Sequence, residues 1–139
     1  MTKEELCGAA CSMLARSYAP YSHFPVGAAL ECADGSVFTG CNIENAAFSP
    51  SICAERTAVA KAVSEGHRDF VRIAVAGSTE RFCPPCGVCR QALAEFCGQE
   101  FPVLFVKGEG EVQRHTLGEL LPFSFSLTGQ EGGESHAHV

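Results

Sequence analysis

Apolar positions near the start of the chain recur at the spacing of one helix face. Thr2 to Glu5 has the layout of a capping box, in which a threonine and a glutamate satisfy each other's backbone groups. The stripe that follows predicts an amphipathic helix over 3–17 and comprises Leu6, Ala9, Ala10, Met13, Leu14 and Ser17. Helix-favouring residues predict further helices over 53–63 and 86–96, and a helical turn over 117–121.

Short apolar runs lie between the predicted helices and indicate strands. These runs cover 26–32, 37–43, 71–76, 102–106 and, at an edge of the sheet, 111–115. Asp34-Gly35 favours a tight hairpin turn between the first two strands. Pro20 and Pro25 keep the segment 18–25 in a loop. Because strands alternate with helices, the order predicts an α/β fold with a mixed sheet and helices on its faces.

The length of 139 residues suits one domain, and 46% hydrophobic with 19% charged residues fits a globular protein. We expect a single domain over 1–128 and a mobile tail over 129–139, which is rich in Gly, Glu and His. His136 and His138 resemble a metal-binding pair, but a solvated tail is the simpler interpretation.

Charge and hydropathy exclude several classes of protein. The net charge is −6 and no basic stripe is present, which disfavours binding to nucleic acid. No apolar run is long enough to span a membrane, and the acidic start lacks the layout of a signal peptide. We therefore expect a cytoplasmic protein with its nine cysteines reduced. Most of five cysteines should pack as small buried hydrophobes: Cys7, Cys11, Cys32, Cys41 and Cys97.

Two short segments carry the candidate chemistry. Cys53-Ala54-Glu55-Arg56 begins one predicted helix, and Pro85-Cys86-Gly87-Val88-Cys89-Arg90-Gln91 begins the next. Cys86 and Cys89 share a helix face, and the positive N-terminal ends of two neighbouring helices would favour thiolates. Three thiolates can hold zinc with the fourth tetrahedral position open for water. The carboxylate of Glu55 beside that open position indicates hydrolytic chemistry.

Other interpretations of the same thiols stay open. Cys83-Pro84-Pro85-Cys86 is also a ligand-spaced pair, and a site with four cysteines would be closed and structural. A Cys-x-x-Cys pair also suits thiol redox chemistry. We favour the open site because Glu55 has no obvious role beside a closed one and because the prolines place Cys83 in extended chain. Three thiolates leave zinc with a net negative charge, which Arg56 can offset by donating to sulfur.

These segments resemble the small zinc-dependent cytidine deaminases of nucleoside salvage. The resemblance runs from about residue 6 to about residue 125 and is carried by five segments: 24–29, 42–46, 53–56, 85–91 and 120–122. It implies a three-layer α-β-α sandwich with a mixed five-stranded sheet. It also implies hydrolytic deamination of cytidine and deoxycytidine to uridine and deoxyuridine, with release of ammonia. A modified aminopyrimidine nucleoside is an alternative substrate, and a closed structural zinc module without catalysis is the alternative from another class.

The resemblance assigns the central chemistry to four residues. It implies one zinc ion per chain, bound by Cys53, Cys86 and Cys89. Glu55 would move a proton from water to the pyrimidine and later to the leaving ammonia. Arg56, together with Gln91, would tune the thiolates from outside the ligand set.

The remaining implied roles concern the nucleoside and the assembly. Asn42 and Glu44 would bind the ribose 3′-hydroxyl, Phe24 would pack on the nucleoside, and the backbone near Ala54 would bind the pyrimidine edge. Such enzymes are typically homotetramers with active sites shared between subunits. Phe125, or else Phe123, is the late aromatic that fits the base of a neighbouring chain. The chain departs from the pattern at Phe48, where relatives often have tyrosine, and at His23, where lysine is common.

Overall fold

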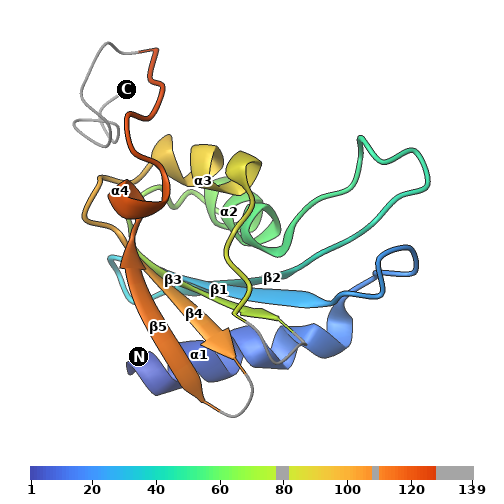
Figure 1. Cartoon of the computed structure of the whole chain (residues 1–139). Coiled ribbons are helices and arrows are strands. Elements are labelled where there is room, and N and C mark those ends of the chain that lie inside the picture. The colour runs from blue at the N-terminus through green and yellow to red at the C-terminus, as the bar shows by residue number, and fades with distance from the viewer. Residues whose placement is uncertain (78–81, 108–109, 128–139) are drawn as a thin grey trace.

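A five-stranded sheet lies between helices in the computed structural model, which describes residues 1–77, 82–107 and 110–127 (Figure 1). The elements are α1 (Lys3–Ser12), η1 (Met13–Arg16), β1 (Val26–Cys32), β2 (Val37–Cys41), α2 (Ala54–Ser64), β3 (Phe70–Gly77), α3 (Gly87–Ala94), β4 (Pro102–Lys107), β5 (Glu111–Thr116) and α4 (Leu117–Leu120). The strand order is β2-β1-β3-β4-β5. β3 and β4 are parallel and the other neighbours are antiparallel, so the predicted mixed sheet is confirmed.

Each face of the sheet packs against its own helical layer. α1 covers one face, and α2 and α3 cover the other (Figure 1). Alternate strand residues point to opposite faces, as the pleat requires. The α1 side buries Ala29, Ala74 and Leu104 with Leu6 and Ala10. The opposite side buries Leu30, Ile73 and Val103 with Ala58 and Leu93. This arrangement is the α-β-α sandwich that the resemblance implied.

Element boundaries differ from the prediction where side chains satisfy the backbone. The helix predicted over 3–17 ends at Ser12 and continues to Arg16 only as a 3₁₀ turn. The strand predicted over 37–43 ends at Cys41 because the Asn42 side chain bonds the backbone of Phe24 and Val26 instead. The predicted edge strand lies at the edge as β5.

The predicted burial of cysteines holds for four of the five residues. Cys7, Cys32, Cys41 and Cys97 are buried, and Cys11 is partly exposed. Within the described residues, no helix is long and apolar enough to cross a membrane. The predicted tail over 129–139 lies outside the described residues, so its mobility stays a prediction.

A glycine lets the helix that carries Cys53 and Glu55 lie close to the sheet. A Cβ atom on Gly40 of β2 would lie 2.3 Å from the carbonyl oxygen of Ala54 and 2.7 Å from the backbone nitrogen of Ala58. No real Cβ atom tolerates such contacts, so any larger residue at position 40 would push α2 away from β2. The position of the first turn of α2 therefore depends on this glycine.

Candidate metal centre and active site

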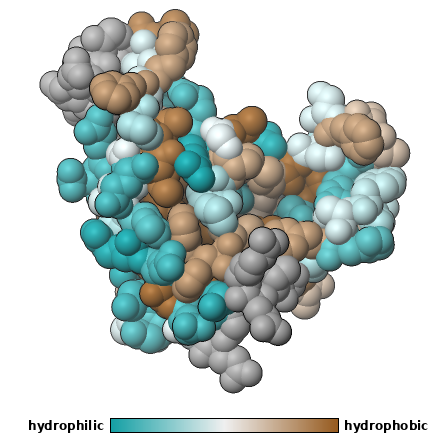
Figure 2. Space-filling model, viewed as in Figure 1, coloured by the Kyte–Doolittle hydropathy of each residue, from teal (hydrophilic) through white to brown (hydrophobic). Residues whose placement is uncertain are grey.

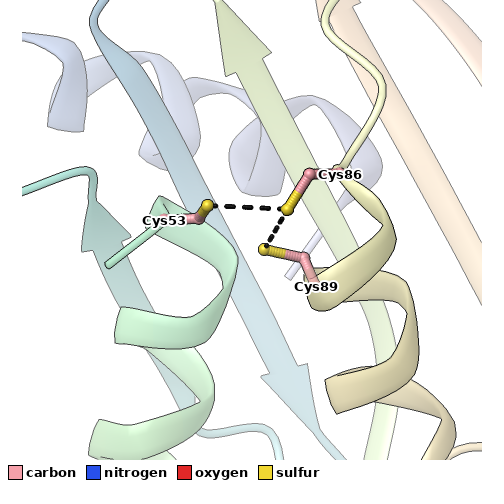
Figure 3. A group of neighbouring side chains, drawn as sticks. All are labelled: Cys53, Cys86 and Cys89. Carbon is pink, nitrogen blue, oxygen red and sulfur yellow. Dashed lines mark hydrogen bonds between the residues drawn. The ribbon is translucent and has the colours of Figure 1, made fainter. Parts of the chain in front are cut away.

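Three thiols meet where two helices begin. Cys53 is the N-cap of α2, Cys86 is the N-cap of α3, and Cys89 lies in the first turn of α3. Their sulfur atoms point toward one another (Figure 3) and all lie within 4.8 Å of one another. Cys53 Sγ and Cys86 Sγ are 3.6 Å apart, and Cys86 Sγ and Cys89 Sγ are 3.4 Å apart. The structure thus brings together the three predicted ligands.

The spacing and the softness of these donors fit zinc. Zinc–sulfur bonds of about 2.3 Å place tetrahedral sulfur ligands about 3.8 Å apart, close to the separations found here. Cys83 is not part of this group, although it lies within the described residues. Its sulfur is 3.7 Å from the position of a Cβ atom on Gly77, and burial chiefly raises the pKa of this thiol to about 11. This geometry favours the open site of three thiols over the closed site of four.

The surroundings of Cys53 and Cys89 shift the pKa values of these two thiols in opposite directions. The hydrogen bond with Cys89, together with the one from Arg56, lowers the pKa of Cys53 to about 5, although burial opposes the shift. The same hydrogen bond, together with burial, raises the pKa of Cys89, and a metal ion would bind the deprotonated form of both thiols. Arg56 Nη2 donates to Cys53 Sγ at 3.7 Å and to the carbonyl of Ser51 at 3.5 Å. Arg56 therefore contacts the sulfur of Cys53, and its tuning of a metal-bound thiolate stays a prediction.

Glu55 follows Cys53 by two residues and is one of two buried charged residues in the described part of the chain. Its side chain is on the first turn of α2 and only 3% of the residue is exposed. Burial raises the pKa of Glu55 to about 7, and the negative charge of Cys53 acts in the same direction. A carboxyl group with this pKa can both accept and donate a proton near neutral pH.

A network of hydrogen bonds links two loops of the site, the loop before β1 and the segment that follows β2. The Asn42 amide joins Ser17, Phe24 and Val26, with the Ser17 hydroxyl donating to Oδ1 at 2.5 Å. The Glu44 carboxylate accepts from the backbone nitrogens of Tyr21 and Ser22 at 3.0 and 3.1 Å. The Ser22 hydroxyl also donates to Glu44 Oε2. These bonds hold the loop before β1 against the segment after β2.

One pocket of about 330 Å³ joins these loops to Cys53, one of the three thiols. Asn42 and Glu44 line it together with Cys53 and Arg56. It is also lined by residues that the sequence did not single out for the site: Tyr21, Ser22, Asn45, Ser51 and Ile52. All five lie within three positions of a predicted site residue in the chain, and Asn45 belongs to the segment 42–46 that carries the resemblance. The pocket is where a polar ligand could reach the metal centre.

The other predicted nucleoside contacts lie at the margin of this pocket or away from it. Phe24 is half-buried, and its Cζ lies 3.4 Å from the position of a Cβ atom on Gly77, next to Cys83. Ala54 is fully buried at the start of α2. Gln91 Nε2 donates to the carbonyl of Phe125 at 3.1 Å, so this amide binds the late aromatic segment. The roles of these residues toward a nucleoside stay predictions.

Fold and site together define a zinc-binding hydrolytic deaminase, with three thiols and a free carboxyl group at two helix starts above a mixed sheet. Residues 1–105 match the family described as cytidine and deoxycytidylate deaminase zinc-binding region. A cytidine deaminase from Sporosarcina psychrophila is 48% identical over 126 residues, which is 91% of this chain and 93% of the relative. The chain belongs to the cytidine deaminase family.

Other relatives agree in sequence and in structure. A cytidine deaminase from Halalkalibacterium halodurans is 53% identical over 110 residues, which is 79% of this chain and 83% of that protein. The crystal structure of a cytidine deaminase from Burkholderia pseudomallei superimposes with a TM-score of 0.86 at 44% identity, over 90% of this chain and all of that one (100%). One from Mycobacterium tuberculosis gives 0.80 at 37% identity, over 91% and 99%. The fold class is therefore confirmed.

Proposed function

We propose that this protein deaminates cytidine and deoxycytidine hydrolytically to uridine and deoxyuridine, releasing ammonia in pyrimidine salvage. The observation that carries this proposal is the buried carboxyl group of Glu55 beside three convergent thiols. Relatives that cover most of the chain carry the name cytidine deaminase, which supports the substrate. A zinc ion on Cys53, Cys86 and Cys89, one per chain, would supply a nucleophilic oxygen from water near neutral pH.

Glu55 is the proton carrier of the proposed reaction. Its raised pKa of about 7 lets it take a proton from the attacking water. It then gives that proton to N3 of the pyrimidine and later delivers one to the leaving amino group. Burial of this carboxyl group keeps bulk water from competing for the proton.

Arg56 supports the ligand set by charge. Three thiolates make the site strongly negative, which weakens a metal's pull on electrons. The guanidinium group of Arg56 donates to Cys53 and offsets part of that charge. The positive ends of α2 and α3 act in the same direction. Gln91 bonds to the backbone of Phe125, and its effect on the thiolates stays a prediction.

Asn42 and Glu44 would bind the ribose 3′-hydroxyl in the pocket that they share with Cys53. Phe24 would pack on the nucleoside, and backbone groups near Ala54 would bind the pyrimidine edge. The proposed substrate is a free nucleoside in the cytoplasm. A polynucleotide is disfavoured because the net charge of −6 repels a phosphate backbone.

Exposed aromatic residues support the proposed homotetramer with shared active sites. Phe125 is 67% exposed, Phe123 is 101% exposed and Phe48 is 75% exposed. Phe48 and Phe123 also hold left-handed backbone angles, with φ of 65° and 55°, which are unusual for bulky residues. Figure 2 shows apolar residues on two protruding parts of this face, the segment before the C-terminus and the loop between β2 and α2. Such residues gain contacts when copies of the chain assemble.

Mixed assemblies can test the shared site. A Glu55→Gln chain and a Phe125→Ala chain would each form defective sites alone. If the late aromatic serves a neighbouring chain, mixing the two kinds of chain in one tetramer would restore activity above that of either parent. Light scattering would give the mass of the assembly, and a stable monomer with full activity would refute the shared site.

The decisive experiment compares the wild-type protein with Glu55→Gln in the ultraviolet spectrum of cytidine. The wild-type protein should convert cytidine to uridine, and a chelator should stop the conversion. Glu55→Gln should retain zinc and its melting temperature but lose about 10²–10⁴ of the rate, the contribution of an acid–base group. Near wild-type turnover by Glu55→Gln would refute the proposed mechanism, whereas no turnover by the wild-type protein would leave a structural zinc module as the better interpretation.

A further inference from the structure

The polar groups of Glu44 are almost fully used inside the protein. Oε1 accepts two backbone hydrogen bonds, from Tyr21 at 3.0 Å and from Ser22 at 3.1 Å. Oε2 accepts one, from the Ser22 hydroxyl. Since each carboxylate oxygen offers about two acceptor positions, Oε1 is filled and Oε2 retains one lone pair.

The amide group of Asn42 has no acceptor position left, but it retains one hydrogen to donate. Its Oδ1 accepts from the Ser17 hydroxyl at 2.5 Å and from the Val26 nitrogen at 2.9 Å, so both lone pairs are used. Its Nδ2 donates one hydrogen to the carbonyl of Phe24 at 3.0 Å. Across the part of the chain that the structure describes, its second hydrogen has no partner.

One free acceptor and one free donor therefore remain in the pocket that Asn42 and Glu44 share. An alcohol group satisfies both, because its hydrogen donates to Glu44 Oε2 and its oxygen accepts from Asn42 Nδ2. A ligand group that can only accept, or only donate, would leave one of the two without a partner, which is costly in a partly buried site.

Ser22 controls this outcome because its hydroxyl bonds both to Glu44 and to the backbone of Phe24. Its oxygen accepts from the backbone nitrogen of Phe24 at 3.1 Å while its hydrogen is donated to Glu44. Asn42 holds the carbonyl of the same Phe24 residue. Asn42 therefore holds the backbone of Phe24 directly, and Glu44 holds it through Ser22. Phe24 is the residue expected to pack on the nucleoside, and Asn42 and Glu44 are the residues expected to bind the ribose.

We propose that Ser22 is a positioning residue that holds Glu44 and Phe24 in the arrangement that binds a nucleoside hydroxyl. This proposal rests on the proposed function. Without the Ser22 hydroxyl, Glu44 Oε2 gains a second free lone pair and loses the contact that orients it, and the Phe24 nitrogen loses its acceptor. Ser22 itself need not touch the substrate.

The test compares cytidine with 3′-deoxycytidine in wild-type protein, Ser22→Ala and Ser22→Thr. Loss of a hydrogen bond to a charged group lowers binding by about tenfold or more. For cytidine, Ser22→Ala should therefore raise KM about tenfold or more with a smaller change in kcat. For 3′-deoxycytidine, which lacks the hydroxyl, the same substitution should change kcat/KM by severalfold at most. Ser22→Thr retains the hydroxyl and should restore most of the kcat/KM for cytidine.

Ser64→Ala is the matched control because it removes an exposed serine hydroxyl that donates to the Lys61 carbonyl at the far end of α2. It should leave both nucleosides unaffected, and the two alanine variants should melt at similar temperatures. An equal loss for cytidine and 3′-deoxycytidine in Ser22→Ala would refute the positioning of Glu44 for the hydroxyl while leaving the proposed function intact. Failure of the wild-type protein to convert cytidine would refute the proposed function and, with it, the role of Ser22.

Discussion

The helices of this protein begin in two different ways. α1 and α4 begin with complete capping boxes, Thr2 with Glu5 and Thr116 with Glu119. The bonds are 2.8 and 3.0 Å in the first box and 2.8 and 3.2 Å in the second. α2 and α3 begin with Cys53 and Cys86, and neither cysteine makes a side-chain capping hydrogen bond.

The difference separates helices that serve stability from helices that serve the site. A side-chain cap contributes about 1 kcal/mol, and α2 and α3 forgo it. Their N-terminal amides and partial positive charge face sulfur atoms instead, where they favour the thiolate form that binds metal. Serine is an ordinary capping residue and Ser51 lies two positions before Cys53, yet the N-cap of α2 is Cys53. The function of the site thus overrides the ordinary capping preference.

Replacing the thiol at the start of α2 by an ordinary capping residue should have the largest effect on activity. Cys53→Ser supplies a favoured capping residue but removes a metal ligand. Zinc content should fall below one per chain, and deamination should fall on the order of a thousandfold or more, because the pKa of the nucleophilic water returns from about 7 toward about 15.7. Metal analysis and the cytidine assay measure both. Cys83→Ser is the matched control and should keep zinc and activity; loss of zinc in this control would favour a site of four thiols.

Displacing α2 while keeping its thiol should have the next largest effect. In Gly40→Ala, the new methyl group would meet the Ala54 carbonyl at 2.3 Å, so α2 must shift. Overpacking of this kind costs about 1–3 kcal/mol, and we expect a lower melting temperature with reduced deamination. Gly8→Ala in α1 is the control, since no atom lies within 4 Å of its Cβ position. It should stabilise the protein by about 0.5–1 kcal/mol. Equal stability of the two variants would contradict the close contact at position 40.

Removing an ordinary cap should alter stability without altering catalysis. Thr2→Ala removes the side chain that accepts from the Glu5 nitrogen, so the free energy of unfolding should fall by about 1 kcal/mol. kcat and KM should stay at wild-type values because α1 lies on the face of the sheet opposite α2 and α3. Urea unfolding measures the first and the cytidine assay the second. Thr2→Ser should recover the stability; a change in kcat would show that α1 is coupled to the site.

The smallest expected effect is the pH dependence of the first capping box. The hydrogen bond from the Thr2 backbone lowers the pKa of Glu5 below its ordinary value of 4.5. Because the folded state binds this proton less readily than the unfolded state, the contribution is present above about pH 4.5 and is lost as pH falls through the folded pKa. The difference in unfolding free energy between the wild-type protein and Glu5→Gln should shrink between pH 6 and pH 3. A difference that is constant with pH would contradict the bond to a charged carboxylate.

Local patterns predict the helix starts and the ligands, because each depends on residues close together in the chain. Thr2 and Glu5 are three residues apart, as are Cys86 and Cys89, and the structure places both pairs as expected. The predicted strands also form one sheet, since each has its own apolar run and turn signals.

Bonds between distant segments could not be predicted in the same way. Ser22 bonds Glu44 across 22 positions, and Ser17 bonds Asn42 across 25 positions. Gln91 reaches Phe125 across 34 positions, where the sequence had suggested a role beside the thiolates. Serine and glutamine are common in ordinary loops, so nothing in their immediate neighbours marks these partners. The end of β2 at Cys41 has the same origin, because the side chain of Asn42 competes with the sheet for backbone groups.

Gly77, the last residue of β3, limits how this enzyme could be re-engineered. Cys83 and Phe24 rest above it, at 2.9 Å and 3.4 Å from the place where a methyl group would stand. A substitution of Gly77 would gain no room for a bulkier base, since every side chain there adds volume beside Phe24. It would lift the aromatic ring and the chain that leads to Cys86 at the same time. New substrates should therefore be sought by trimming the walls of the pocket.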